Sequence, residues 1–388
     1  MEAVLENDVK SPSAKDAIKA EVSLSNLQKA LRIIERGIVR ASTIPILQSV
    51  RIEQLAEGLA IQSTDLDSSI KALIPEITKL SVPLLIPSDR FLPWAKLLEG
   101  EQVKITASSA RVTLQSAGHL KGAKALFPRL DVKNFPAFQF TGDGEGFEMQ
   151  QDDLLRILKH TIIAIGDEVQ YTLNGILLEA DGSTLYAVAT DGHRMAIYSR
   201  PMPKAFRYLI PERMLKLLLP VIVEGRESVR IQEQQGGFLA SVAADIPVFV
   251  SCRKPNGTFP NWRAAMPNDF QATVAVDSQA LLGSLGRCIL IGDKKSHAVK
   301  MEFTSNGVNL WAVDALAGEA EESVDATGGP NEPYRLGVNG TYLAQALKQI
   351  TGDVLVKLPK EYGQSVLFYS QPAEGEAFNY IVMPLRIS

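Results

Sequence analysis

An acid, an imidazole and a hydroxyl lie close together in the segment Thr190-Asp191-Gly192-His193-Arg194. The runs LYAVATD before it and MAIYS after it follow strand patterns, so the segment is predicted to lie where one strand gives way to the next. A strand-end loop that carries an acid beside a histidine could support acid–base or nucleophilic hydrolysis. A hydrolase that uses His193 and Asp191 is therefore one hypothesis to weigh.

The other parts of a catalytic site are missing from the sequence. Nucleophilic hydrolysis needs a serine or cysteine that a histidine activates, yet no Gly-x-Ser-x-Gly elbow occurs, and Cys252 and Cys288 lie outside these strands. The four histidines have no metal-ligand spacing. Neither a phosphate-binding P-loop motif nor a dinucleotide fingerprint occurs. We therefore expect no catalytic residues, no metal and no cofactor.

Composition and charge limit the partners and the location. The 388 residues carry a formal net charge of -4, so a nucleic-acid surface would have to be local. Two solitary cysteines fit a reducing cytoplasm. No apolar run is long enough to span a bilayer, so no membrane partner is expected. Residues 1–20 mix acids and bases and are predicted to be a polar, disordered leader.

The strand–turn–strand layout of the Thr190-Asp191 segment occurs three times. GLAIQSTDLDSSIKA repeats it at Thr64-Asp65, and NLWAVDALAGEAEES repeats it at Val313-Asp314 with the threonine replaced. The copies lie about 125 residues apart, which is the size of a domain. Only the middle copy carries Gly-His-Arg. The scaffold is therefore tripled, and the residues that invite a catalytic interpretation are not.

Two helical segments recur with the same period. NLQKALRIIERGI, for which Ser25 is the expected N-cap, has counterparts in DDLLRILKHTIIAI and SQALLGSLGRCILIGDKK. A shorter helix lies in SDRFLPWAKLL, in PERMLKLLL and in NGTYLAQALKQ. Many strands and few helices predict antiparallel sheets packed on a helix pair, an α+β fold. The predicted domains are 21–141, 142–267 and 268–388, and short proline-rich joints predict an arc that closes by self-association.

Four segments in colinear order carry a family resemblance: VQYTLNGILLE, VATDGHRMAIYS, TFPNWRAAMP and YIVMPLR. Together with the threefold repeat, they make the chain resemble the bacterial DNA polymerase III beta subunit, the DNA sliding clamp. The resemblance implies a ring-shaped head-to-tail homodimer without catalytic activity, in which helices line the hole. It also implies that the ring encircles double-stranded DNA without sequence specificity and is opened by a clamp loader. The implied partners are the DNA polymerase III alpha subunit and other proteins with clamp-binding linear motifs.

A sliding ring needs basic side chains that contact phosphates without reading bases. All six predicted helices carry such residues: Lys29, Arg32, Arg36, Arg40, Arg90, Lys96, Arg156, Lys159, His160, Arg213, Lys216, Arg287, Lys294, Lys295 and Lys348. A single charged helix face is usually ordinary solvated surface, and the recurrence favours DNA binding. By the resemblance, DNA contacts are expected at Arg40, Arg90, Gln170 and Tyr171, while Thr172 stands where the family also has an aromatic residue.

The resemblance further implies a pocket between the second and third domains, into which partners insert an apolar linear motif. The implied pocket residues are Leu173, Thr190, Gly192, His193, Arg194, Met195, Pro260, Ala265, Ile381, Met383, Pro384, Leu385 and Arg386. Core packing is the alternative interpretation of Met383 and Leu385. Gly192 also suits a turn with positive φ. Ile387 and Ser388 follow Arg386, where the family has a shorter terminus.

Three hypotheses result from the sequence. The first is a sliding clamp that encircles DNA. The second is a clamp-like peptide-binding protein without stable ring closure, and the third is the hydrolase. The oligomeric state separates the first two, because a closed ring requires a dimer.

Overall fold

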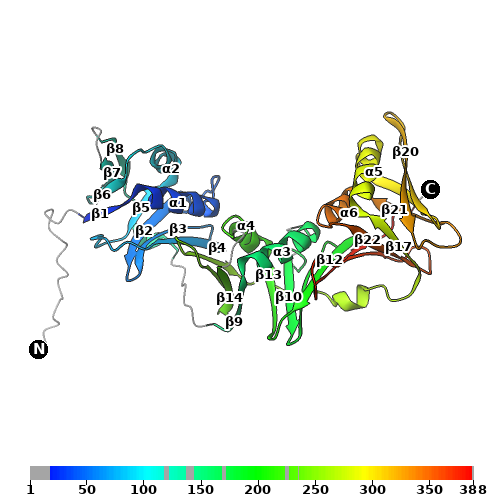
Figure 1. The fold of residues 1–388 in the computed structure, drawn as a ribbon. Coiled ribbons are helices and arrows are strands. Elements are labelled where there is room, and N and C mark those ends of the chain that lie inside the picture. Colours follow the sequence, from blue (N-terminus) through cyan, green and yellow to red (C-terminus); the bar gives the residue numbers. More distant parts are fainter. Residues whose placement is uncertain are drawn as a thin grey trace, which may run out of the picture. The chain divides into compact units, whose positions relative to one another are not determined.

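The computed structural model describes residues 18–117, 122–136, 144–167, 172–222, 227–234 and 236–386. The chain forms two compact units, one of residues 1–148 with 227–253 and one of residues 149–226 with 254–388. Antiparallel sheets with helices packed on them make up both units (Figure 1). No helix in the described ranges is long and apolar enough to span a membrane.

The same order of elements occurs three times: a strand, a helix, four strands, a second helix and three strands. The first repeat contains β1 (Ile18–Ser23), α1 (Leu24–Ile34), β2 (Ser49–Leu55), β3 (Gly58–Thr64), β4 (Ser68–Ile74), β5 (Leu84–Pro87), α2 (Ser88–Lys96), β6 (Gln102–Ala107), β7 (Arg111–Ala117) and β8 (Lys124–Pro128). The second contains β9 (Gly146–Gln150), α3 (Gln151–Thr161), β10 (Gly175–Asp181), β11 (Thr184–Thr190), β12 (Arg194–Pro201), β13 (Ala205–Pro211), α4 (Glu212–Leu218), β14 (Ser228–Gln234), β15 (Gly237–Val242) and β16 (Val248–Arg253). The third contains β17 (Phe270–Asp277), α5 (Ser278–Ile291), β18 (Ala298–Phe303), β19 (Gly307–Asp314), β20 (Gly318–Thr327), β21 (Tyr334–Asn339), α6 (Gly340–Leu347), β22 (Asp353–Pro359), β23 (Val366–Ser370) and β24 (Ala377–Val382). The prediction of three similar α+β repeats is confirmed.

Strand pairing links one repeat to the next. The first unit has a four-stranded sheet, β1-β6-β7-β8, and an eight-stranded sheet, β5-β2-β3-β4-β16-β15-β14-β9. The second unit has a twelve-stranded sheet, β13-β10-β11-β12-β24-β23-β22-β17-β20-β19-β18-β21. In both units the fourth strand of one repeat pairs with the last strand of the following repeat, as β4–β16 and as β12–β24. A continuous sheet therefore crosses each junction between repeats.

This pairing explains why the compact units do not coincide with the repeats. Strands β14 to β16 belong to the first unit, whereas β10 to β13 belong to the second. The middle repeat is thus shared, because each half of it continues a sheet of a neighbouring repeat. Strand β1 begins at Ile18, inside the segment predicted as a leader, and residues 1–17 lie outside the described residues.

The first helix of each repeat packs across the inner strands of its sheet. Helix α1 buries Leu27, Leu31 and Ile34 completely against β3 and β4, as its apolar spacing predicts. Its N-cap is Ser23, whose Oγ accepts from the amide of Asn26 at 3.4 Å. The expectation of Ser25 as the cap was wrong, because β1 continues to Ser23 and the helix begins directly after it.

Candidate peptide site and nucleic-acid interface

The loop between β11 and β12 is a turn held by its own side chains. Thr190 Oγ1 donates to the carbonyl of Arg194 at 2.7 Å and accepts from the amide of Gly192 at 3.1 Å. Asp191 Oδ1 accepts from the amides of His193 and Arg194, at 2.9 and 3.0 Å. Gly192 has φ of 86°, a left-handed conformation that glycine adopts without strain. The Thr-Asp pair therefore shapes the turn.

The first repeat contains the same turn. Thr64 Oγ1 donates to the carbonyl of Ser68 at 2.8 Å, and Asp65 Oδ1 accepts from the amides of Asp67 and Ser68 at 3.0 and 2.6 Å. Leu66 takes the position of the glycine, with φ of 84°. Asp65 accepts from the equivalent backbone amides although no histidine follows it. The repeated acid therefore reflects turn geometry. The Thr-Asp pair of the hydrolase hypothesis is thus explained by turn geometry.

Arg194 fixes this loop to α6. Its Nε donates to Asp191 Oδ2 at 2.9 Å, and Nη1 donates to Gln345 and to the hydroxyl of Tyr380, the latter at 3.3 Å. The guanidinium carbon lies 3.9 Å from the ring centroid of Tyr342. Only 10% of the Arg194 side chain is exposed. Arg194 therefore holds the loop in place through its Nε and Nη1 groups.

The segment after β24 lies against the same loop. The amide of Met383 donates to the carbonyl of His193 at 2.9 Å, and the amide of Leu385 donates to the carbonyl of Gly337 on β21 at 2.8 Å. Pro384, which has no amide hydrogen, stands between these two donors. The side chains of Met383 and Leu385 are 48% and 36% exposed. Core packing therefore does not account for these two residues.

A buried apolar cluster lies beside the exposed residues. Met195 and Ile381, both less than 5% exposed, belong to it together with Phe259 and Trp262, and Leu173 packs against it. The full cluster is Leu177, Val188, Met195, Ile197, Leu209, Phe259, Trp262, Leu367 and Ile381. Its members come from β10 to β13, β23, β24 and the connector that follows β16. Of the predicted pocket residues, the cluster thus brings together Leu173, Met195 and Ile381.

The connector from Phe259 to Met266 contributes more than the sequence prediction assigned to it. Pro260 and Ala265, the two predicted residues, are exposed, whereas Phe259 and Trp262 are buried. The Trp262 indole donates to Glu179 Oε2 at 3.1 Å. Burial would raise the pKa of Glu179, but hydrogen bonds from Arg263 and Trp262 outweigh it and lower that pKa. An aromatic pair in a short joint that begins and ends near proline is the sequence signal that marks these residues.

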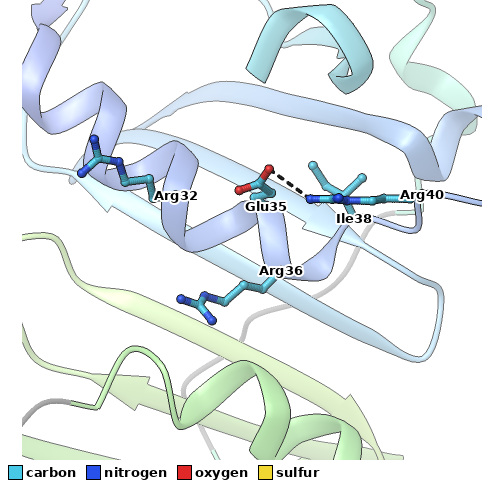
Figure 2. A pocket seen from close by; sticks show the side chains of 5 residues that line it. All are labelled: Arg32, Glu35, Arg36, Ile38 and Arg40. Carbon is cyan, nitrogen blue, oxygen red and sulfur yellow. Dashed lines mark hydrogen bonds and ion pairs between the residues drawn. The ribbon is translucent and has the colours of Figure 1, made fainter. Parts of the chain in front are cut away.

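Three arginines surround an open hollow at the end of α1. Arg32, Arg36 and Arg40 line it with Glu35 and Ile38, and its volume is about 560 Å³ (Figure 2). The Arg40 side chain is 83% exposed and its Nη2 lies 3.4 Å from Glu35 Oε1. Arg90, at the start of α2, is 90% exposed. The first repeat therefore presents exposed cations, while Gln170 and Tyr171 lie outside the described residues.

The other bases counted on the helices differ in availability. His160 is 7% exposed and packs against the rings of Tyr198 and Phe378, with centroids 4.8 and 4.9 Å away. Burial lowers the pKa of His160, so counting it as a surface cation was wrong. Arg287 on α5 donates to both carboxylate oxygens of Glu322 at 2.6 Å. The basic excess is therefore clearest in the first repeat.

Family comparison agrees with the repeat structure. The family of the DNA polymerase III beta subunit matches in three consecutive parts: the N-terminal domain over residues 16–139, the central domain over 148–261 and the C-terminal domain over 263–386. The chain belongs to the DNA polymerase III beta subunit family. Each matched domain of the family spans one structural repeat.

Relatives within this family are similar along their whole length. The beta sliding clamp of Salmonella typhimurium is 25% identical over 381 residues, covering 95% of this chain and 100% of the relative. The beta sliding clamp of Escherichia coli is 24% identical with the same coverage. The crystal structure of the DNA polymerase sliding clamp from Bacillus subtilis, 20% identical, matches with a TM-score of 0.87 over 96% of this chain and 100% of that one.

Proposed function

We propose that this chain is a DNA sliding clamp, a ring that encircles duplex DNA and tethers replication proteins to it. It acts without catalysing a reaction, as a processivity factor for DNA polymerase III in the cytoplasm. The observation that carries the proposal is the strand pairing between consecutive repeats. A ring forms when the same pairing continues into a second chain. Family membership supports the same function.

Both junctions inside the chain use the same pairing. Besides the β4–β16 and β12–β24 ladders, each junction has a backbone hydrogen bond to the turn of the preceding repeat, donated by the last residue of β16 or by the residue that follows β24. The amide of Arg253 donates to the carbonyl of Asp67 at 2.8 Å, and the amide of Met383 donates to that of His193 at 2.9 Å. The repeated geometry indicates a standard head-to-tail joint between repeats.

The third repeat contains the strand that would form such a joint, β20. In the described residues, β20 pairs only with strands of its own repeat. Strand β20 pairs along its length with β19, but pairs with β17 only at Val276–Ala326 and Ala275–Thr327. In the described part of the chain, β8 forms the edge of the first repeat's four-stranded sheet. We infer that β20 of one copy pairs with β8 of another. Two such joints close a homodimer of six repeats.

Side chains at the two edges are complementary. Strand β20 carries the acids Glu319, Glu321 and Asp325, all exposed, whereas β8 begins with the exposed base Lys124. Leu126 on β8 is 51% exposed. An acidic edge that faces a basic one favours heterologous pairing over pairing of either edge with itself.

DNA binding is proposed to be topological, with phosphate contacts from Arg40, Arg90 and the arginines of the α1 hollow. Direct affinity should be weak, because few cations contact phosphates. It should fall as the salt concentration rises, because each of those contacts releases counterions from DNA. Gln170 and Tyr171 remain proposed contacts. Partner motifs, including those of a clamp loader and the polymerase alpha subunit, are proposed to bind beside the Thr190–Arg194 loop and the segment from Met383 to Arg386.

Retention on DNA tests this function. The protein is loaded onto nicked circular plasmid by a clamp loader, washed in high salt, and the plasmid is then linearised. A sliding clamp stays on the circle and leaves the linear molecule. Light scattering on the same preparation should give the mass of two chains. A monomer that binds peptides but never remains on circles would support the alternative, a peptide-binding protein without ring closure.

A further inference from the structure

The sheet of the third repeat has a hollow lined by an aromatic ring and two cations. Lys300 on β18, Trp311 on β19 and Arg335 on β21 line it with Met301, and its volume is about 340 Å³. Lys300 pairs directly with Trp311 and, on its other side, with Gly337. We call this feature the Trp311 hollow. It lies outside the apolar cluster and the loop described above.

The repeats contain matching positions. Trp311 stands three residues before Asp314, as Gln62 stands before Asp65 and Val188 before Asp191. The cross-strand partners also match: Arg51 pairs with Gln62, Leu177 with Val188, and Lys300 with Trp311. The same face of each repeat's sheet can therefore be compared residue by residue.

A connector with an aromatic anchor covers this face in the first repeat. Phe135, 4% exposed, lies over Arg51, with 5.8 Å between the guanidinium carbon and the ring centroid. The connector reaches the face along the sheet edge, where the amide of Leu130 donates to the carbonyl of Leu85 at 2.9 Å. Leu85 in turn pairs with Arg51. A cation on the sheet thus accommodates an aromatic side chain that directly follows the 3-10 turn Val132–Asn134 of the connector.

The second repeat uses the same arrangement with apolar partners. Leu177 and Val188 are buried in one cluster with Phe259 and Trp262 of the connector that follows β16. Trp262 also reaches Glu179, two residues beyond Leu177 on the same face. In two repeats out of three, therefore, this face holds an aromatic residue supplied by a neighbouring segment.

The matching face of the third repeat has the same hydrogen bond at its edge. In the described residues, this face remains uncovered. The amide of Leu385 donates to the carbonyl of Gly337 at 2.8 Å, as Leu130 does to Leu85. Lys300 and Arg335 are nevertheless exposed, with 75% of the Arg335 side chain accessible, and Trp311 is half-buried. Arg335 Nε donates to Glu302 at 2.5 Å, and a guanidinium has four further N–H groups.

We propose that the Trp311 hollow is a second docking site for partner proteins, and that it binds a linear peptide with an aromatic residue near an acidic one. The aromatic ring would contact the Trp311 ring, as Trp262 contacts Tyr186 in the second repeat, where the two rings are tilted and their centroids lie 5.4 Å apart. The acid would meet Lys300 and Arg335. Glu302 and Glu321, on the same face, disfavour a polyanion such as single-stranded DNA.

The test uses a fluorescein-labelled peptide of residues 131–136, Asp-Val-Lys-Asn-Phe-Pro, taken from the connector of the first repeat. Fluorescence polarisation with the full chain should show saturable binding that Trp311→Ala weakens at least tenfold. Met383→Ala, in the proposed motif pocket, should leave it unchanged. Replacing phenylalanine by alanine in the peptide should abolish binding.

A second readout needs no destabilising variant. The indole N–H resonance of Trp311, assigned with Trp311→Phe, should shift as peptide is added, while those of Trp94 and Trp262 should not. No saturation at millimolar peptide, equal affinity for wild type and Trp311→Ala, or loss of binding only in Met383→Ala would overturn the proposal. Displacement of the peptide by oligothymidylate at lower concentration than by unlabelled peptide would overturn it in favour of a nucleic-acid site.

Discussion

Arg156 on α3 donates from Nη1 to both carboxylate oxygens of Glu376, at 3.2 and 3.0 Å, across 220 positions of sequence. Glu376 is 6% exposed and also accepts from the hydroxyl of Tyr198. The Nε of Arg200 lies 3.9 Å from the same carboxylate. A buried acid of the third repeat is therefore held by three side chains of the second, beside the β12–β24 ladder.

Replacing Glu376 by glutamine should destabilise the second unit. The substitution removes the anion shared by Arg156, whose side chain is 39% exposed, and Arg200, which keeps Asp153 at 2.6 Å. Weakening hydrogen bonds between charged groups in this way should cost about 1.5 to 3 kcal/mol. Urea denaturation followed by circular dichroism measures the change. Glu374→Gln, an exposed acid two residues earlier, is the matched control and should change the free energy of unfolding by less than about 0.5 kcal/mol.

Stability of the second unit should fall in mild acid because of His160. Its Nδ1–H donates to the carbonyl of Arg156 at 2.7 Å, and burial lowers its pKa below the ordinary value of 6.5. The unfolded chain then binds more protons, so the free energy of unfolding rises with pH. This contribution is complete above the unfolded pKa and is lost as pH falls through it toward the folded pKa.

Urea unfolding at about pH 7.5 and about pH 5.5, on either side of the pKa of a solvent-exposed histidine, measures this dependence. His160→Phe retains an aromatic ring between Tyr198 and Phe378 and should reduce the difference between the two pH values. Exposed His193 provides the control, since His193→Phe removes a histidine outside this contact. An identical pH dependence in wild type and His160→Phe would show that another group is responsible.

Local patterns predicted the repeats because each pattern depends on neighbouring residues. Alternating apolar residues around Thr64, Thr190 and Val313 identified matching strand pairs, and helical spacing identified α1. The joints between repeats could not be predicted in the same way. Pairing of Arg194 with Val382 is set by two strands far apart in sequence, and no local pattern encodes their register.

Tertiary burial also decided what single side chains do. His160 was counted as a base because it follows Lys159 on a helix, yet its face of α3 packs on aromatic rings of β12 and β24. Arg194 lies in a turn, where a surface position was expected, but Tyr342 and Gln345 of α6 bury it. Charge in a sequence gives the chemistry of a residue, and only the fold determines its access to a partner.

Arg194→Lys should weaken binding of a partner peptide about tenfold while leaving the fold intact. Lysine keeps the charge but cannot engage Asp191, Gln345 and Tyr380 together or stack on Tyr342 as a planar group. The loop would lose its fixed position beside Met383. Titration of a fluorescent polymerase-tail peptide gives the dissociation constant, and Arg207→Lys on the exposed sheet edge is the control. Equal affinities for wild type and Arg194→Lys would mean that loop position does not matter for binding.

Removing the residues from Met383 onward should abolish peptide binding but preserve the dimer. Strand β24 ends at Val382, so its ladder with β12 remains. The exposed side chains of Met383 and Leu385 are lost, and apolar anchors buried against them are worth about 1.5 to 3 kcal/mol each, or about ten- to a hundredfold in affinity. The double variant Met383→Ala, Leu385→Ala keeps the backbone bonds and should reproduce the loss. If both variants bind the peptide as wild type does, the motif pocket lies elsewhere.

Leu126→Glu should convert the dimer into monomers. Leu126 is exposed on β8, which the head-to-tail joint pairs with β20 of the other copy. A glutamate there would face the acids Glu319, Glu321 and Asp325, so buried apolar contact would be replaced by like-charge repulsion. Ile77→Glu is the matched control, because Ile77 is 71% exposed in the same unit but lies outside β8. Light scattering over a dilution series should show that Leu126→Glu raises the dimer dissociation constant at least about a hundredfold, which corresponds to about 2.7 kcal/mol.

The monomer should keep its affinity for a partner peptide and lose retention on circular DNA. Retention by a monomeric Leu126→Glu protein would refute ring closure as the basis of DNA binding, and an intact dimer would place the subunit joint away from β8.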